Sequence, residues 1–131
     1  MVTAPRQFFA IVDPETGVRI AWRLVVADRW WSRLRGLLGR AGLEEGEALV
    51  LSPCSAIHTL AMRFPIDVLF LDQRGVIRCA RRAVPPWRLG PICRGSVVAV
   101  ELPVGTIDRY GLEPGRILRI QQESSDAPYE R

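Results

Sequence analysis

The chain contains no lysine and no asparagine, and it has a single histidine. All 18 basic residues are therefore arginines, a uniformity that fits genomic base bias better than selection at one site. No apolar run approaches the roughly 20 consecutive residues that a membrane-spanning helix requires. The first residues lack the charged and apolar regions of a signal peptide. We therefore expect a cytoplasmic protein without a membrane span.

Cysteine is also scarce, and its three positions, Cys54, Cys79 and Cys93, form no C-x-x-C pair. An odd number of cysteines fits reduced thiols better than the disulfide framework of a secreted scaffold. Cys54 and His58 are four residues apart and would share a helix face, but two ligands do not complete a zinc site. We expect free thiols, no metal site and no cofactor.

The chain length suits one globular domain, since 131 residues with 48% hydrophobic content can bury a sizeable core. We expect this domain to cover residues 1–121 and the polar residues 122–131 to form a flexible tail. Apolar runs bounded by turn residues predict strands at 7–12, 18–26, 47–51, 67–72, 76–84, 96–102 and 116–121. The segment 85–95, which is rich in proline and glycine, predicts an irregular loop.

Two helices are expected between these strands. Asp28 is a suitable N-cap for an amphipathic helix from Arg29 to Arg40, whose apolar side chains follow one stripe. A single helical turn follows Thr106 and ends at Gly111. Strands at short spacing combined with two helices predict an α+β domain built on a mainly antiparallel, barrel-like sheet.

Four segments of the sequence occur in a familiar order. They are Arg35 to Arg40, Phe64 to Asp72, Ala99 to Gly105 and Gly111 to Gly115. Together they resemble the prokaryotic family known as domain of unknown function 192, over roughly residues 18–120. The resemblance implies a small single-domain α+β fold with no agreed activity, substrate or cofactor.

The central run from Ile57 to Asp72 contains the first candidates for a functional site. Asp67 shares a strand face with Leu69 and Leu71, so its carboxylate is expected to enter the core. A buried carboxylate must be hydrogen-bonded, and the backbone amides of the bend after Pro65 are the expected donors. The alternative is that Asp67 contacts a ligand or takes part in catalysis.

Glu101 and His58 raise the same choice between structure and function. Glu101 lies on a predicted strand and could pair with Arg35 or Arg63, and such buried pairs are more often structural than catalytic. His58 is the only imidazole and hence the natural general base, with Thr59 beside it. A lone histidine is, however, more often a hydrogen-bonded part of a loop or core.

These observations favour a non-catalytic binding or interaction module for a small molecule or a protein. Its shallow site would lie where residues 58–67 meet Glu101 and the loop 85–95. The predicted ligand-binding residues are His58, Thr59, Arg63, Asp67, Glu101 and Arg35. The alternative is a small hydrolase or transferase that uses His58 with Asp67 or Glu101.

A third hypothesis concerns the charge of the segment between Asp72 and Glu101, which has no acidic residue. Its arginines are Arg74, Arg78, Arg81, Arg82, Arg88 and Arg94. Arginines near Trp87 could follow a phosphate backbone or an acidic partner. The predicted hairpin distributes them over two faces, so nucleic-acid binding should be weak and non-specific, with Kd of roughly 10⁻⁴ to 10⁻⁶ M.

Overall fold

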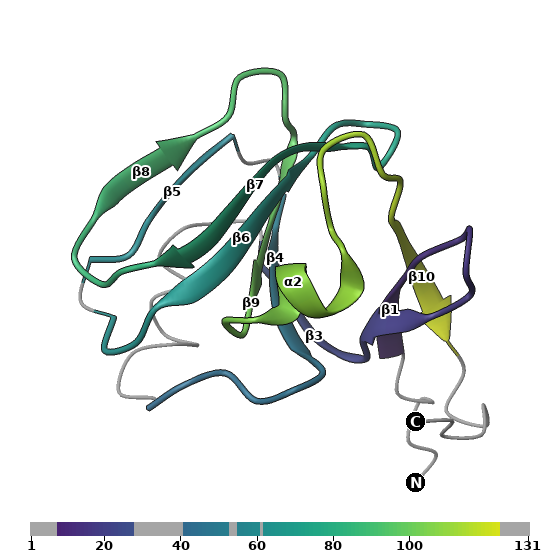
Figure 1. Cartoon of the computed structure of the whole chain (residues 1–131), viewed down its shortest axis with the longest axis horizontal. Coiled ribbons are helices and arrows are strands. Elements are labelled where there is room, and N and C mark those ends of the chain that lie inside the picture. The colour runs from purple at the N-terminus through teal and green to yellow at the C-terminus, as the bar shows by residue number, and fades with distance from the viewer. Residues whose placement is uncertain (1–7, 28–40, 53–54, 61, 124–131) are drawn as a thin grey trace, which may run out of the picture.

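The computed structural model describes residues 8–27, 41–52, 55–60 and 62–123 (Figure 1). Its centre is a five-stranded sheet with the strand order β3-β4-β9-β6-β7. The strands are β3 (Arg23–Ala27), β4 (Glu47–Leu51), β9 (Val98–Leu102), β6 (Ile66–Leu71) and β7 (Ile77–Val84). The β3–β4 pair is parallel and the other neighbouring pairs are antiparallel.

Two smaller sheets and a short helix, α2 (Thr106–Tyr110), accompany the central sheet. One sheet has the order β10-β1-β2 and consists of β1 (Phe8–Val12), β2 (Arg19–Ala21) and β10 (Arg119–Glu123). The other pairs β5 (Ala56–His58) with β8 (Leu89–Ile92) and is called the ribbon below. Figure 1 shows the ribbon and the β1–β10 pair at opposite ends of the molecule.

Both faces of the central sheet are covered, and β6 is buried over its whole length. On one face, residues such as Leu69 and Val100 pack with Ile107 of α2 in a first core. On the other face, residues such as Phe70 pack with Ile57 of the ribbon in a second core. Burial on both faces explains why the sequence of β6 is a nearly continuous apolar run.

The barrel-like arrangement expected from the sequence is wrong. The central sheet ends at β3 on one side and at β7 on the other, and these edges are not joined within the described residues. The β6–β7 register shifts twice, and such irregularities bend and twist a strand. Exposed arginines on β7 are also typical of a sheet edge that faces solvent. The fold is a small single domain with mixed sheets and one short described helix.

The predicted strand 18–26 is in fact two strands that belong to different sheets. The chain turns at Trp22, where the amides of Trp22 and Arg23 both donate to the carbonyl of Gly46 at 2.9 Å. Gly46 has a φ of +86°, and a Cβ there would lie 2.3 Å from the Trp22 ring. The corner therefore requires glycine. The alternation of apolar and polar side chains could not reveal this change of sheet, because each of the two strands alternates normally.

Other predicted strands and the short helix are present, with ends that differ by a few residues from the prediction. The hairpin of β6 and β7 is confirmed, and so is the short helix after Gly105. The last strand extends to Glu123, two residues beyond the predicted end. The amphipathic helix predicted at residues 29–40 lies outside the described residues, as do residues 124–131 of the predicted tail. Neither β5 nor β8 was predicted.

Candidate functional site

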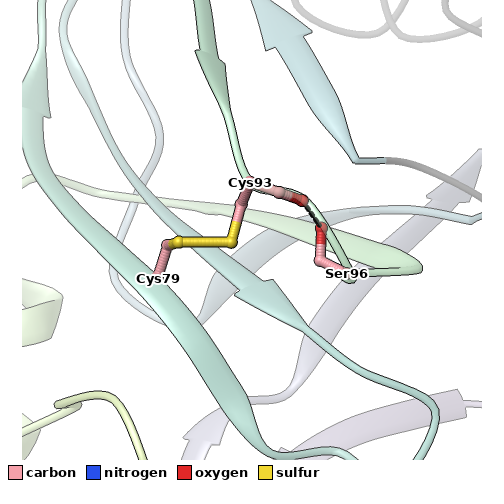
Figure 2. Close-up of a disulfide and its surroundings, with 3 residues drawn as sticks. All are labelled: Cys79, Cys93 and Ser96. Carbon is pink, nitrogen blue, oxygen red and sulfur yellow. Dashed lines mark hydrogen bonds between the residues drawn. A yellow bond between two sulfur atoms is a disulfide. The ribbon is translucent and has the colours of Figure 1, made fainter.

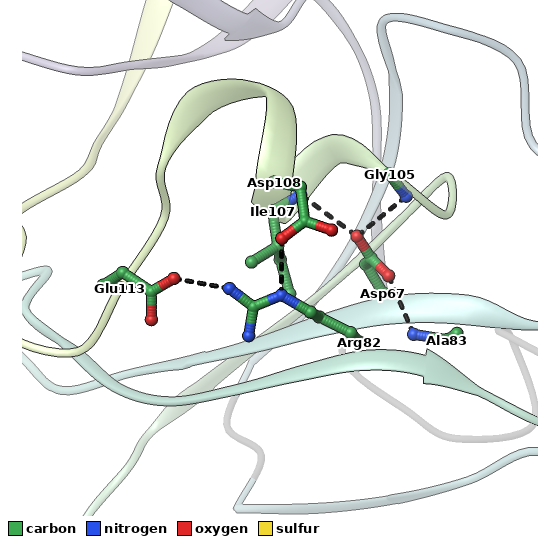
Figure 3. A network of polar contacts seen from close by, with 7 residues as sticks. All are labelled: Asp67, Arg82, Ala83, Gly105, Ile107, Asp108 and Glu113. Carbon is green, nitrogen blue, oxygen red and sulfur yellow. Dashed lines mark hydrogen bonds and ion pairs between the residues drawn. The ribbon is translucent and has the colours of Figure 1, made fainter.

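Asp67 of β6 is buried where β6 and β7 meet the start of α2 (Figure 3). Its Oδ1 accepts a hydrogen bond from the Ala83 amide at 2.9 Å, and its Oδ2 accepts from the amides of Gly105 and Ile107 at 3.1 and 3.0 Å. These bonds offset the cost of removing a carboxylate from water. The predicted amide-binding role is confirmed, but the donors do not come from the bend after Pro65.

A β-bulge makes the Ala83 amide available to Asp67. The register shifts between Ile66 and Val68, where β7 has one more residue than β6. Ala83 lies in this bulge with a φ of +47°, a left-handed conformation that is uncommon outside glycine. Its amide turns out of the β-ladder toward the carboxylate, so Asp67 completes the hydrogen bonding of an irregular strand.

Arg82, next to Ala83, is held by two acidic side chains from the α2 region (Figure 3). Its Nε donates to Asp108 at 2.7 Å and its guanidinium also pairs with Glu113. The hydrogen bonds with Asp108 and Glu113 raise the pKa of the Arg82 guanidinium above its usual range. Arg82 of the basic segment is therefore already paired within the molecule, and so is Arg74, whose guanidinium lies 3.3 Å from the Asp72 carboxylate.

Glu101 of β9 is completely buried in the centre of the sheet, opposite Val68 and Leu49. Val68 and Leu49 belong to the second core, whereas Asp67 lies opposite Leu102 of the first core. Residues directly opposite each other in neighbouring strands share a face, and successive residues alternate. The central sheet therefore separates the two carboxylates that the sequence suggested for a single site.

Thr59 fastens the ribbon to the loop that precedes β8. Its Oγ1 donates to the Pro85 carbonyl at 2.6 Å and accepts from the Arg88 amide at 2.9 Å. Its backbone amide donates to the Arg88 carbonyl at 2.9 Å, and its carbonyl accepts from the Trp87 amide at 2.8 Å. Every polar group of this fully buried residue is thus engaged in positioning the loop.

A second bulge decides which side chains of the ribbon point outward. Ala56 pairs with Ile92 and His58 with Leu89, so two steps along β5 match three along β8. Ile57 points into the second core, and its neighbours on β5 must face away from it. The bulge thus gives Leu89 and Ile92 the same outward orientation, with exposed fractions of 84% and 67%.

Trp87 is the third exposed apolar side chain of this segment, with an exposed fraction of 68%. Its φ is +62°, and the hydrogen bond from its amide to Thr59 helps to hold this unfavourable conformation. Strained backbone persists only where the surroundings impose it, and it concentrates at functional sites. We call the exposed surface of Ala56, His58, Trp87, Leu89 and Ile92 the ribbon surface.

Cys79 of β7 is bonded to Cys93, the residue after β8 (Figure 2). The expectation of free thiols is therefore wrong for these two cysteines. They are 14 residues apart and meet only because the chain folds back after β7, which their spacing could not reveal. The carbonyl of Cys93 also accepts from the Ser96 hydroxyl at 2.8 Å (Figure 2). The far end of the ribbon is thus covalently tied to the central sheet.

His58 and Arg63 make none of the hydrogen bonds that hold the Asp67 carboxylate. His58 is half-buried on the ribbon, and its Nδ1 accepts from the Leu60 amide at 3.3 Å. Arg63 is exposed, whereas Arg35 lies outside the described residues. Of the predicted residues that the structure describes, only His58 contributes to the ribbon surface.

Sequence reasoning placed the loop 85–95 at the site and named Trp87 only beside the arginines, and it did not single out Leu89 and Ile92. The prolines around them indicated an irregular loop and concealed a short strand, since proline is rare inside sheets. A usable signal was nevertheless present, because three large apolar residues occur within six positions without an alternating pattern that would bury them.

The residue types that bind metal ions do not cluster in the part of the chain that the structure describes. No group of three histidine, cysteine, aspartate or glutamate side chains there is suited to hold a metal ion. In the same residues, no helix has the length and apolar character needed to cross a membrane. The surface chemistry at the ribbon is instead that of apolar side chains, one imidazole and nearby arginines.

Comparison with known proteins places the chain in a family. Residues 11–120 match the DUF192 family, which is described as "Uncharacterized ACR". The chain belongs to this family, as the resemblance in sequence had implied. A relative from Thermococcus sibiricus, named UPF0127 protein, is 30% identical over 112 residues, which cover 81% of this chain and 72% of the relative.

Two crystal structures share the fold. A protein from Sinorhizobium meliloti 1021, described as a proposed transcription regulator, has a TM-score of 0.71 at 19% identity, covering 92% of this chain and 98% of that one. A protein of unknown function from Novosphingobium aromaticivorans has a TM-score of 0.66 at 17% identity, covering 90% and 94%. At such identities the likeness concerns the fold alone.

Proposed function

We propose that the protein is a non-catalytic binding or interaction module and that the ribbon surface is its binding surface. The observation that carries this proposal is the exposure of Trp87, Leu89 and Ile92. Burying an apolar side chain of this size contributes about 1.5 to 3 kcal/mol. A partner that covers all three therefore gains a large part of its binding free energy from them, as expected for an exposed apolar cluster.

The way the ribbon is held supports this proposal. The hydrogen bonds of Thr59 fix one end of β8, and the Cys79–Cys93 bond fixes the other. A surface held in one conformation loses little conformational entropy when it binds. The exposed side chains are therefore presented on a rigid support, which favours binding over a role as a loose connection.

The proposal keeps the kind of site that the sequence predicted, a shallow binding surface, and moves its location to the ribbon. It keeps His58 and the loop 85–95, and it removes Asp67 and Glu101. Asp67 binds three amides, and Glu101 is buried between neighbouring strands. Both carboxylates are better explained as parts of the scaffold that supports the binding surface.

An enzyme that uses His58 with Asp67 is less well supported, and so is one that uses Glu101, because Glu101 faces the second core but is completely buried. A catalytic base must come within hydrogen-bond reach of its partner. Asp67 faces the first core, whereas the ribbon that contains His58 packs on the second core. The hypothesis of a nucleic-acid binder is also weakened, because Arg82 is paired with Asp108 and Glu113.

Site-specific photo-crosslinking tests the binding surface even while the partner is unidentified. Benzoylphenylalanine is introduced at position 89 in cells that produce the protein, and adducts are detected by gel shift and by intact mass. The matched control is position 117, because Ile117 is also exposed but precedes β10, away from the ribbon. We expect adducts at position 89, of protein or of lipid mass, that are absent at position 117.

A second variant makes the test specific to the ribbon surface. Adducts at position 89 should decrease strongly when Trp87→Ala is added, since Trp87 is part of the same surface. Equal labelling at positions 89 and 117, or no adduct at position 89, would overturn the proposed function.

A further inference from the structure

We propose that the ribbon surface docks on an anionic lipid bilayer. Trp87, Leu89 and Ile92 would enter the boundary between headgroups and acyl chains, and nearby arginines would contact the anionic headgroups. This inference rests on the proposed function, because it names the partner of the same surface.

Charge around the ribbon favours an anionic partner. The segment between Asp72 and Glu101 contains arginines but no acidic residue. Arg88 lies between Trp87 and Leu89, and Arg94 follows Ile92 by two positions. Both arginines are exposed and form no ion pair with any residue that the structure describes. Their charges are therefore available to a negatively charged surface.

Acidic side chains lie in other parts of the described structure. The ion pairs formed by Asp108, Glu113 and Glu45 involve α2 and its neighbours, and Glu123 pairs with Arg19 on the sheet at the far end. The ribbon end of the molecule is thus basic and the residues that would repel an anionic surface lie elsewhere. Such an asymmetry orients a protein on a charged bilayer.

The apolar side chains favour a bilayer over other anionic partners. Leu89 and Ile92 offer nothing to a phosphate backbone, and Trp87 is a single stacking partner, which makes a poor nucleic-acid platform. A protein partner needs a pocket whose shape matches these side chains, whereas the fluid acyl chains of a bilayer adapt to the side chains that insert. Tryptophan is moreover the side chain that concentrates at membrane interfaces, and arginine reaches the headgroups from the same depth.

Vesicle flotation with the full chain tests the proposal. One vesicle population contains phosphatidylcholine alone, and the other contains equal parts of phosphatidylcholine and phosphatidylglycerol. We expect binding to the anionic vesicles that weakens as salt rises. Vesicles with brominated acyl chains should quench tryptophan fluorescence, and Trp87→Phe should remove most of that quenching if Trp87 is the residue that inserts.

Single-residue variants distinguish insertion of apolar side chains into the bilayer from a general attraction between the basic protein and anionic lipid. Leu89→Ser should weaken binding about tenfold, as loss of a buried leucine predicts. Arg88→Ala should weaken it about fivefold, the effect expected for one basic residue near an anionic surface. The matched controls are Val104→Ser and Arg119→Ala, exposed positions outside the ribbon, and they should leave binding unchanged.

Three results would overturn the lipid proposal. The first is equal or absent binding to the two kinds of vesicle. The second is an equal loss for Arg88→Ala and Arg119→Ala with no effect of Leu89→Ser. The third is protein adducts at position 89 without vesicle binding, which would leave the proposed function in place and identify a protein as the partner. The variants change exposed side chains, and unchanged thermal melting confirms their fold.

Discussion

Asp67 shows how a single carboxylate can hold three elements of a fold together. Its two oxygens accept from a bulged residue of β7 and from two amides at the start of α2. The Ala83 amide points out of the β-ladder, and the Gly105 and Ile107 amides lie at the start of α2. Without the Asp67 carboxylate, all three would be left without an acceptor in the protein. The acid in the middle of an apolar strand is therefore a structural requirement of the bulge and of the short helix.

We expect Asp67→Ala to lower the free energy of unfolding by about 3 kcal/mol, about 1 kcal/mol for each amide that loses its acceptor. Asp67→Asn keeps one carbonyl oxygen and should cost less. Denaturant unfolding of both variants and the wild type measures these differences. An unchanged unfolding free energy for Asp67→Ala would show that the amides do not depend on the carboxylate.

Asp72 provides a residue-scale prediction for pH. Partial desolvation raises the pKa of its carboxyl, but hydrogen bonds from the amides of Val76 and Arg74 and the Arg74 side chain outweigh this effect. The net pKa lies below its ordinary value of 3.8. A carboxyl with a depressed pKa in the folded state stabilises the protein above its unfolded pKa, and this stabilisation disappears as pH falls through the folded pKa.

Asp72→Asn should therefore be less stable than the wild type near neutral pH, with a difference that shrinks as the solution is made more acidic than pH 3.8. Thermal melts of both proteins across this acidic range provide the measurement. A difference that stays constant down to the lowest pH would contradict the depressed pKa.

Residue patterns predicted Asp67 well, because a carboxylate on the face of Leu69 and Leu71 must enter the core. They could not identify its donors, since the amides of Ala83 and Gly105 come from elements distant in sequence. The same limit applies to Glu101. Both carboxylates were recognised as buried, but their assignment to opposite faces depends on the strand order, which a sequence pattern does not contain.

At the scale of elements, the ribbon depends on the Thr59 hydroxyl. The side chain is buried and makes two hydrogen bonds, to the Pro85 carbonyl and from the Arg88 amide. In a regular pair of strands, backbone groups of the neighbouring strand would bond to this carbonyl and this amide. Here the bulge and the prolines interrupt the ladder, so the Thr59 hydroxyl takes the place of those backbone groups.

Thr59→Val keeps the shape of the side chain and removes its hydrogen bonds, and it should lower the free energy of unfolding by roughly 1 to 3 kcal/mol. Amide hydrogen exchange at Arg88 should become faster. Thr59→Ser is the matched control, because it retains the hydroxyl and should keep the exchange slow. Fast exchange in both variants would point to lost packing of the methyl group instead.

Strand prediction succeeded where paired strands follow each other directly in the chain, and it failed where the pairing depends on residues distant in sequence. The β6–β7 hairpin has apolar runs and a turn around Gly75, so its local sequence was sufficient. The change of sheet at Trp22 depends on a contact with Gly46, which is distant in sequence. β8 contains Pro91 and a bulge, and its partner β5 is short, so neither strand had a clear pattern of its own.

At the scale of the whole molecule, the Cys79–Cys93 bond closes a loop with a sequence separation of 14. Cross-linking a loop of about this length stabilises a protein by about 3 kcal/mol in the chain-entropy model. The bond also bears on the expected cytoplasmic location, because disulfides persist mainly in oxidising compartments. The odd count of cysteines gave the opposite expectation, since it says nothing of which pair lies close in space.

Thiol titration of the denatured, unreduced protein should therefore give one equivalent per chain, and three after reduction. Cys54→Ser should bring the first number to zero. Replacing Cys79 and Cys93 together by serine should lower the free energy of unfolding by about 3 kcal/mol. Three equivalents without reductant, in protein purified without reducing agents, would show that the pair is reduced.

The attachment of the ribbon has a consequence for the evolution of this fold. The ribbon is joined to its surroundings by backbone groups, one hydroxyl and one disulfide. The outward side chains at positions 87, 89 and 92 take no part in those bonds, so mutations there carry little penalty in folding. Lineages that inherit this scaffold are therefore free to acquire different specificities by changing a few outward positions. Grafting these positions between relatives should transfer binding preference and leave the shared architecture intact.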